Sequence, residues 1–161
     1  MLAAVTDPEI PVITIEELGV LRDVDVRDGR ITVTITPTYS GCPAMQEIEA
    51  DVRAALGRRG WDDVDLRTVL SPAWTTDWMN EDGRRKLRDD GIAPPAPRRT
   101  GPVLVQLARR PGSASAALAP VDCPQCGSPD TEELTRFGST SCKALWRCRS
   151  CREPFDHFRA H

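Results

Sequence analysis

Long hydrophobic runs are missing from this sequence of 161 residues. No apolar stretch approaches the roughly 20 residues that cross a bilayer, which excludes a conventional membrane-spanning helix. The first six residues contain no Lys or Arg, so we expect no secretory signal. These absences predict a cytoplasmic protein with no membrane partner. Its six cysteines should then be reduced or metal-bound, because disulfides are rare in that compartment.

Histidine and basic stretches are also scarce. The histidines are His157 and His161 alone, so Cys42 has no histidine base near it in sequence, which disfavours a thiol enzyme. Residues 1–92 hold 11 Lys and Arg against 18 Asp and Glu, and residues 122–161 hold six of each sign. Because nucleic-acid-binding domains carry a basic patch or stripe, we expect no nucleic-acid partner.

Residues 31–56 form the stretch around which the predicted fold is arranged. Apolar residues alternate with threonines from Ile31 to Ile35, which predicts a half-buried strand. The polar residues that follow form a loop, and Pro43 suits the first turn of a helix. Apolar residues at steps of three and four then predict a helix that ends near Leu56.

Cys42 lies where this loop meets the predicted helix. Unpaired backbone N–H groups and the positive end of the helix dipole favour a thiolate there, the form that binds a metal or attacks a substrate. The alternative is a small buried side chain, since free cysteines are usually buried. The sequence leaves both interpretations open.

Two further strands complete a predicted sheet. Val20 to Val26 alternates in polarity, and Asp28-Gly29 joins it to the strand at Ile31 as a hairpin. A third strand is predicted from Asp63 to Leu70, and the helix before it allows a parallel crossover. Glu81 to Asp90 is predicted to be a charged helix tail that Gly91 ends. The predicted fold is α/β: a small two-layer sandwich with a three-stranded mixed sheet and helices on one face.

A change of composition separates this domain, residues 1–92, from the end of the chain. Residues 93–120 are rich in proline, alanine and serine, which predicts a linker that is partly extended and partly flexible. Val103 to Leu107 is apolar enough to add an edge strand or to lie against the first domain. The second predicted domain spans residues 121–161.

Four cysteines of that second domain form two Cys-x-x-Cys pairs, with 21 residues between them. They are Cys123, Cys126, Cys148 and Cys151. Two such pairs on facing hairpins converge on one tetrahedral site, which predicts a β-hairpin zinc ribbon. Iron can take the same ligands, and disulfides are the alternative that the compartment disfavours. The site is closed to catalysis, and the metal should supply most of the folding energy of so small a module.

Three more residues are candidates for a functional site. Cys142 lies outside both pairs, and the neighbouring Lys143 favours its thiolate. It is either a packing residue near the ribbon or a second reactive thiol. Asp7 and Glu9 flank a proline, and are either solvated carboxylates, helix-capping groups or neighbours of Cys42.

Several motifs resemble known families. Three of them look like the SufT-like iron–sulfur assembly domain family: Asp7-Pro8-Glu9, Thr38 to Pro43, and Pro72 to Met79. Two more accompany the Cys-x-x-Cys pairs, Phe137 to Leu145 and Cys151 to Asp156. With these added, nearly the whole chain except the linker is similar to the PaaD family, accessory subunits encoded with the phenylacetyl-CoA epoxygenase system.

The resemblance implies an accessory or maturation role rather than an enzyme. PaaD-like proteins accompany a di-iron oxygenase that epoxidises the ring of phenylacetyl-CoA, together with its iron–sulfur reductase, and are thought to mature or repair those metal centres. Applied to this chain, the resemblance implies that Cys42 is the thiol that handles iron or a transient iron–sulfur cluster. It also implies that Asp7 and Glu9 are the carboxylates of a family motif. One cysteine cannot hold a cluster alone, so we expect a homodimer or a transient complex with a client.

A second hypothesis is a structural, non-catalytic subunit of the oxygenase, which binds partners through the ribbon and a surface formed by Trp74 and Trp78. Family members usually have a helix before the Asp-Pro-Glu motif, whereas six residues precede Asp7. We therefore also expect part of the sheet face to be uncovered or available to a partner.

Overall fold

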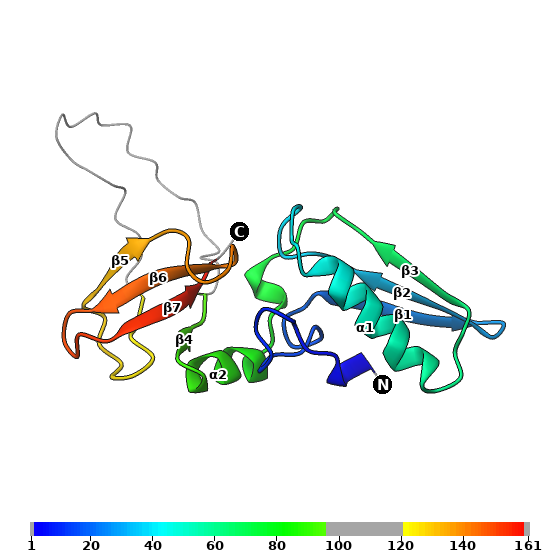
Figure 1. The fold of residues 1–161 in the computed structure, drawn as a ribbon, viewed down its shortest axis with the longest axis horizontal. Helices are drawn as coiled ribbons and strands as arrows, with labels where there is room; N and C mark the ends of the chain where they lie inside the picture. The colour runs from blue at the N-terminus through cyan, green and yellow to red at the C-terminus, as the bar shows by residue number, and fades with distance from the viewer. Residues whose placement is uncertain (1, 96–120, 160–161) are drawn as a thin grey trace, which may run out of the picture.

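The computed structural model describes residues 2–95 and 121–159 (Figure 1). In chain order the elements are η1 (Leu2–Ala4), β1 (Leu21–Arg27), β2 (Arg30–Ile35), α1 (Met45–Gly57), β3 (Val64–Thr68), η2 (Thr76–Trp78), α2 (Glu81–Asp89), β4 (Ile92–Ala93), β5 (Thr131–Thr135), β6 (Lys143–Cys148) and β7 (Pro154–Phe158). Within the described ranges, no helix is both long and apolar enough to cross a membrane.

The first sheet has the order β1-β2-β3, with β1 antiparallel and β3 parallel to β2. This confirms the predicted three-stranded mixed sheet. Asp28 and Gly29 both have positive φ, as a two-residue hairpin turn requires. The helix α1 begins at Met45, two residues later than the position of Pro43 predicted, because residues 43 and 44 form a turn.

The main core lies between this sheet and α1. Ile31, Val33 and Ile35 are fully buried and belong to the same apolar cluster as Ile48 and Val52 of α1. Because strand side chains alternate, the threonines of β2 face the opposite side of the sheet, where they are half-buried. The sequence thus folds as the two-layer arrangement that its two-residue period predicted.

The side of the sheet that α1 covers is partly exposed along its edge strand β1. Val24 pairs with Val33 and Val26 with Ile31, so both valines point to the α1 side, since directly paired residues share a face. They are nevertheless 41% and 52% exposed. The α1 side of the sheet is therefore partly exposed at β1.

The second sheet has the order β4-β7-β6-β5. The antiparallel strands β5, β6 and β7 are the predicted ribbon. The sequence did not predict β4, which pairs in parallel with β7 through Ile92 and Ala93. Ala93, which composition had placed in the linker, is thus a strand residue. Residues 96–120, including the apolar stretch from Val103 to Leu107, lie outside the described residues.

A continuous apolar contact joins the two sheets. Phe158 of β7 is buried in the main core, and its ring centroid lies 5.9 Å from that of Trp74. The Trp74 indole donates a hydrogen bond to the carbonyl of Leu18 at 3.0 Å. Trp74 is therefore a buried packing residue, so the predicted partner surface formed by Trp74 and Trp78 is wrong. The helix α2 contacts β4 at this junction, and the helix α1 lies along the first sheet (Figure 1).

His157 of β7 makes the ribbon sensitive to acid. Its ring centroid lies 5.7 Å from that of Trp146, and burial lowers its pKa from 6.5 to about 4. The unfolded state binds the proton first, so this contribution to stability is complete above pH 6.5 and is lost as the pH falls toward 4. We expect a loss of about 1–2 kcal/mol in the free energy of unfolding between pH 7 and pH 5. Urea unfolding at the two pH values measures it, and an equal loss in His157→Gln would contradict the assignment.

Candidate metal centre and thiol site

Four sulfur atoms converge at one end of the ribbon. The ligand atoms of Cys123, Cys126, Cys148 and Cys151 all lie within 4.8 Å of one another. The Cys123 and Cys151 sulfurs are 3.7 Å apart, and those of Cys126 and Cys148 are 3.6 Å apart. A tetrahedron with metal–sulfur bonds of about 2.3 Å has sulfur–sulfur edges of about 3.8 Å. The four side chains therefore fit a four-coordinate metal ion.

Local backbone geometry sets these positions. In the first pair, the Gly127 N–H donates to the Cys123 carbonyl at 2.8 Å, and Gly127 takes a φ of 72°, which glycine adopts without steric cost. In the second pair, the Cys151 N–H points at the Cys148 sulfur at 3.5 Å. The Ser128 and Ser150 hydroxyls, 2.8 Å apart, link the two turns. The site is thus held by both Cys-x-x-Cys turns.

Among these thiols, that of Cys148 has a lowered pKa. The backbone N–H of Cys151 lowers the pKa of Cys148 to about 6, because it stabilises the thiolate. A metal ion that binds four thiolates displaces the remaining thiol protons. Zinc and iron both accept this ligand set, and all four positions are filled by sulfur, so the site suits a structural ion.

Cys42 lies in the turn before α1. The residue is half-buried and packs against the main core. The prediction that its surroundings favour a thiolate is wrong. Burial raises the pKa of Cys42, the charges of Asp7 and Glu9 raise it further, and the Ala44 N–H opposes them only in part. Its thiol needs a metal ion or another proton acceptor before it reacts.

Asp7 has a structural role. Its Oδ1 accepts hydrogen bonds from the N–H groups of Glu9 and Ile10 at 2.9 and 3.0 Å, so it caps the proline-containing turn that follows it. The side chain is buried, and burial raises its pKa despite these hydrogen bonds. Because Asp7 fixes this turn, it also sets the position of the Glu9 side chain.

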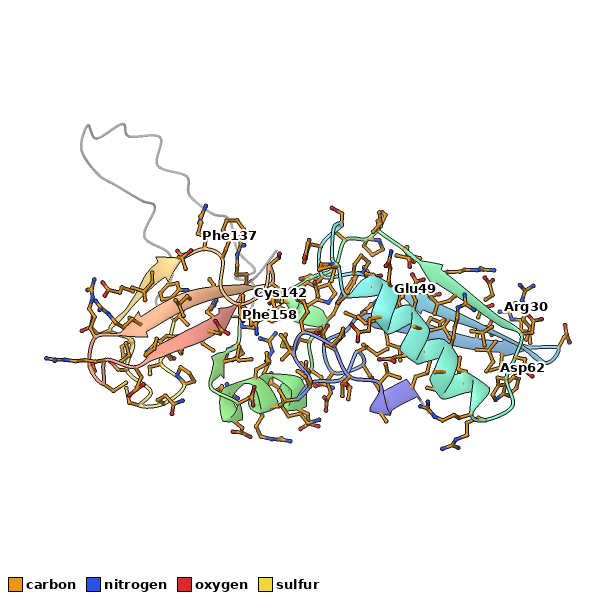
Figure 2. The ribbon with its side chains drawn as sticks, in the orientation of Figure 1. Arg30, Glu49, Asp62, Phe137, Cys142 and Phe158 are labelled. Carbon is orange, nitrogen blue, oxygen red and sulfur yellow. The ribbon has the colours of Figure 1, made fainter. Side chains whose placement is uncertain are left out.

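Cys142 is buried, and its neighbouring lysine does not favour the thiolate as predicted. Its neighbour Lys143 forms an ion pair with Asp156 at 3.5 Å and so does not activate the thiol. Cys142 is 5% exposed, and burial, with the nearby charge of Glu9, raises its pKa to about 12. Figure 2 shows Cys142 and Phe158 close together at the end of the ribbon that faces the first domain.

The two domains place their candidate residues together. The Cys142 thiol donates a hydrogen bond to Glu9 Oε2 at 3.4 Å across 133 residues of sequence. Tyr39, in the Cys42 loop, is hydrogen-bonded through its phenol to Ser141 and experiences the charges of Cys42, Glu9 and Cys142. We call Glu9, Tyr39, Ser141 and Cys142 the interdomain seam. Sequence reasoning did not single out Tyr39 or Ser141, because no local pattern relates these loops.

Comparisons with known proteins cover both halves of the chain. Residues 1–65 match the family described as iron–sulfur cluster assembly protein, and residues 109–159 match the family described as PaaD zinc beta ribbon domain. The chain is 45% identical over 160 residues to a protein of Escherichia coli (strain K12) that is named as one of the subunits of 1,2-phenylacetyl-CoA epoxidase. That match covers 99% of this chain and 88% of the relative.

Two further likenesses concern the first half alone. A protein of Porphyromonas gingivalis (strain ATCC BAA-308 / W83), named as an Fe-S protein maturation auxiliary factor, is 40% identical, with 54% of this chain and 84% of the relative covered. The crystal structure of a domain of unknown function, DUF59, from Bacillus anthracis superposes with a TM-score of 0.50 and 29% identity. It covers 53% of this chain and 83% of that one.

Proposed function

The chain belongs to the PaaD family, in which an iron–sulfur cluster assembly domain is joined to a zinc ribbon, and from this premise we propose that it matures or repairs a metal centre of the phenylacetyl-CoA epoxidase system. It acts in the cytoplasm as an accessory protein rather than as an enzyme. Its clients are the di-iron oxygenase subunit or the iron–sulfur reductase subunit, and Cys42 handles the iron or cluster cargo.

One observation carries this proposal: Cys42 is a half-buried cysteine whose thiol lies within electrostatic reach of the Asp7 and Glu9 carboxylates. Thiolates bind iron and iron–sulfur clusters, and a carboxylate next to a thiol adds a second kind of iron ligand. The relative named as an Fe-S protein maturation auxiliary factor matches about half of this chain. The ribbon ion, which we propose to be zinc, holds the second domain in shape and takes no part in transfer.

Replacing Cys42 by alanine tests the function directly. We expect activation of the oxygenase and reductase subunits, measured by their iron and sulfide content and by substrate-dependent oxygen uptake, to fall more than about tenfold. Ser40→Ala changes an exposed residue of the same loop and should leave activation unchanged. Circular dichroism and ribbon metal content should be the same for both variants. Full client activation by Cys42→Ala would refute the proposal.

The second candidate is a structural subunit of the oxygenase. The exposed side chains of Leu134 and Phe137 on the β5 side of the ribbon favour it, because apolar residues on a small module often mark a contact site. Co-purification with the oxygenase in fixed stoichiometry, with Cys42 dispensable, would support this alternative. Transfer by a transient complex, or by a homodimer that bridges a cluster through two Cys42 thiols, predicts no fixed stoichiometry.

A further inference from the structure

Cys142 is held beside the Cys42 loop by contacts from both domains. Its thiol bonds to Glu9 of the first domain at 3.4 Å and to the Thr140 hydroxyl of its own loop at 3.0 Å. The Tyr39 and Ser141 side chains make a second link across the interdomain seam, and the Trp74 and Phe158 rings pack behind it. Several independent contacts therefore fix one thiol of the ribbon domain next to a carboxylate of the assembly domain.

Neither the ribbon metal site nor the ion pair of the neighbouring lysine explains this arrangement. Cys142 is outside the four-sulfur site, and the nearby cation, Lys143, is paired with Asp156. Cys142 belongs to the buried apolar cluster of the main core, yet its sulfur also bonds to a hydroxyl and a carboxylate. Glu9 is also within electrostatic reach of both Cys42 and Cys142, so its charge is felt by the two thiols together.

We propose that Cys142 is a second thiolate ligand for the iron cargo, which it holds together with Cys42 and Glu9 within a single chain. The inference rests on the proposed function of Cys42 and adds the residue that Cys42 lacks. Two thiolates and one carboxylate occupy three positions of a divalent iron ion and leave further positions for ligands of a client. This open site differs from the ribbon site, which four sulfurs close.

Loading this site involves movement of the two loops. Among the described residues, the ribbon cysteines are the group of three or more ligands whose atoms converge, so Cys42, Glu9 and Cys142 do not lie at metal-binding distances in this structure. Glu9 is bonded to Cys142 and lies within electrostatic reach of Cys42. A divalent ion that binds them displaces two thiol protons to solvent and draws the Cys42 loop and the loop at residues 137–142 together. The ribbon, held in shape by its own metal, thus presents one ligand of the transfer site.

Divalent cobalt is a suitable probe, because its thiolate complexes absorb light and it takes the place of iron or zinc. The full chain is first loaded with one zinc ion per ribbon and then titrated with cobalt without oxygen. We expect one further cobalt ion per chain with thiolate charge-transfer absorption. Cys142→Ser should lower the cobalt affinity at least about tenfold and remove roughly half of the charge-transfer intensity. Glu9→Gln should weaken binding and keep the intensity.

Ser139→Ala is the matched control, because Ser139 lies in the same loop but bonds to Asp156 instead of Glu9; its titration should equal that of the unmodified chain. An unchanged titration in Cys142→Ser, or no cobalt bound beyond the zinc-loaded ribbon in the unmodified chain, would overturn this inference. Failure here is separable from failure of the proposed function: client activation that needs Cys42 but is unaffected by Cys142→Ser would retain the function and reject the second ligand.

Discussion

Cys148→Ser is expected to release the ribbon metal and unfold β5, β6 and β7. Cys148 is the most deeply buried of the four ligands, with no exposed surface, and the backbone N–H of Cys151 lowers the pKa of its thiol. The apolar cluster of the ribbon is small and includes two of the metal ligands themselves, Cys123 and Cys148. A structural zinc ion contributes about 10 kcal/mol or more to folding in modules of this kind, which this cluster cannot replace.

Metal content and tertiary structure measure this result. We expect bound zinc to fall from one per chain to less than about a tenth, and the near-ultraviolet dichroism of Trp146 to be lost. Ser150→Ala is the control, because Ser150 lies between two ligands of the same turn and is exposed. That variant should keep its metal and lose only the hydroxyl contact with Ser128. A folded, fully metallated Cys148→Ser protein would show that the four sulfurs are not the ligand set.

The ribbon and the first sheet were predictable because their determinants are local. The two-residue period from Ile31 to Ile35 and the Asp28-Gly29 turn fixed the hairpin, and the register follows from which face is buried. The Cys-x-x-Cys turns likewise carry their geometry in a few consecutive residues. The repeated Cys-x-x-Cys spacing also indicated the four cysteines whose sulfur atoms converge.

Long-range packing decided what the sequence did not show. No residue near Cys142 in the sequence indicates its contact with Glu9, which is 133 residues away. The neighbouring Lys143 suggested that the Cys142 thiol is ionised, but the sequence did not show that Lys143 pairs with Asp156. For Cys42, the backbone N–H at the start of the helix lowers the pKa, as the sequence predicted, but burial raises the pKa by more. The strand β4 is two residues long, too short for any period to predict it.

The interdomain seam gives the ribbon metal a route to affect the first domain. The strand β6 begins at Lys143, directly after Cys142, and ends at the metal ligand Cys148. Loss of the metal therefore loosens the strand that positions Cys142. This predicts that in Cys148→Ser the second cobalt site weakens together with the ribbon, although neither Cys42 nor Glu9 has changed.

Gly19→Ala is expected to destabilise the first domain by about 3 kcal/mol. Gly19 has a φ of 76°, and a Cβ atom there would lie 2.6 Å from both Cβ and the carbonyl oxygen of Trp78. The left-handed conformation alone costs an alanine about 1 kcal/mol, and forcing an extra methyl group into packed surroundings adds about 1–3 kcal/mol. Trp78 cannot move aside freely, because Arg22 stacks on its ring at 3.5 Å.

Gly29→Ala separates the two contributions. Gly29 has nearly the same backbone conformation, with a φ of 78°, but no atom lies within 4 Å of the position its Cβ would take. This variant should therefore lose only about 1 kcal/mol, and the difference between the two variants in urea unfolding isolates the clash with Trp78. Equal losses would mean that the chain can shift at Trp78.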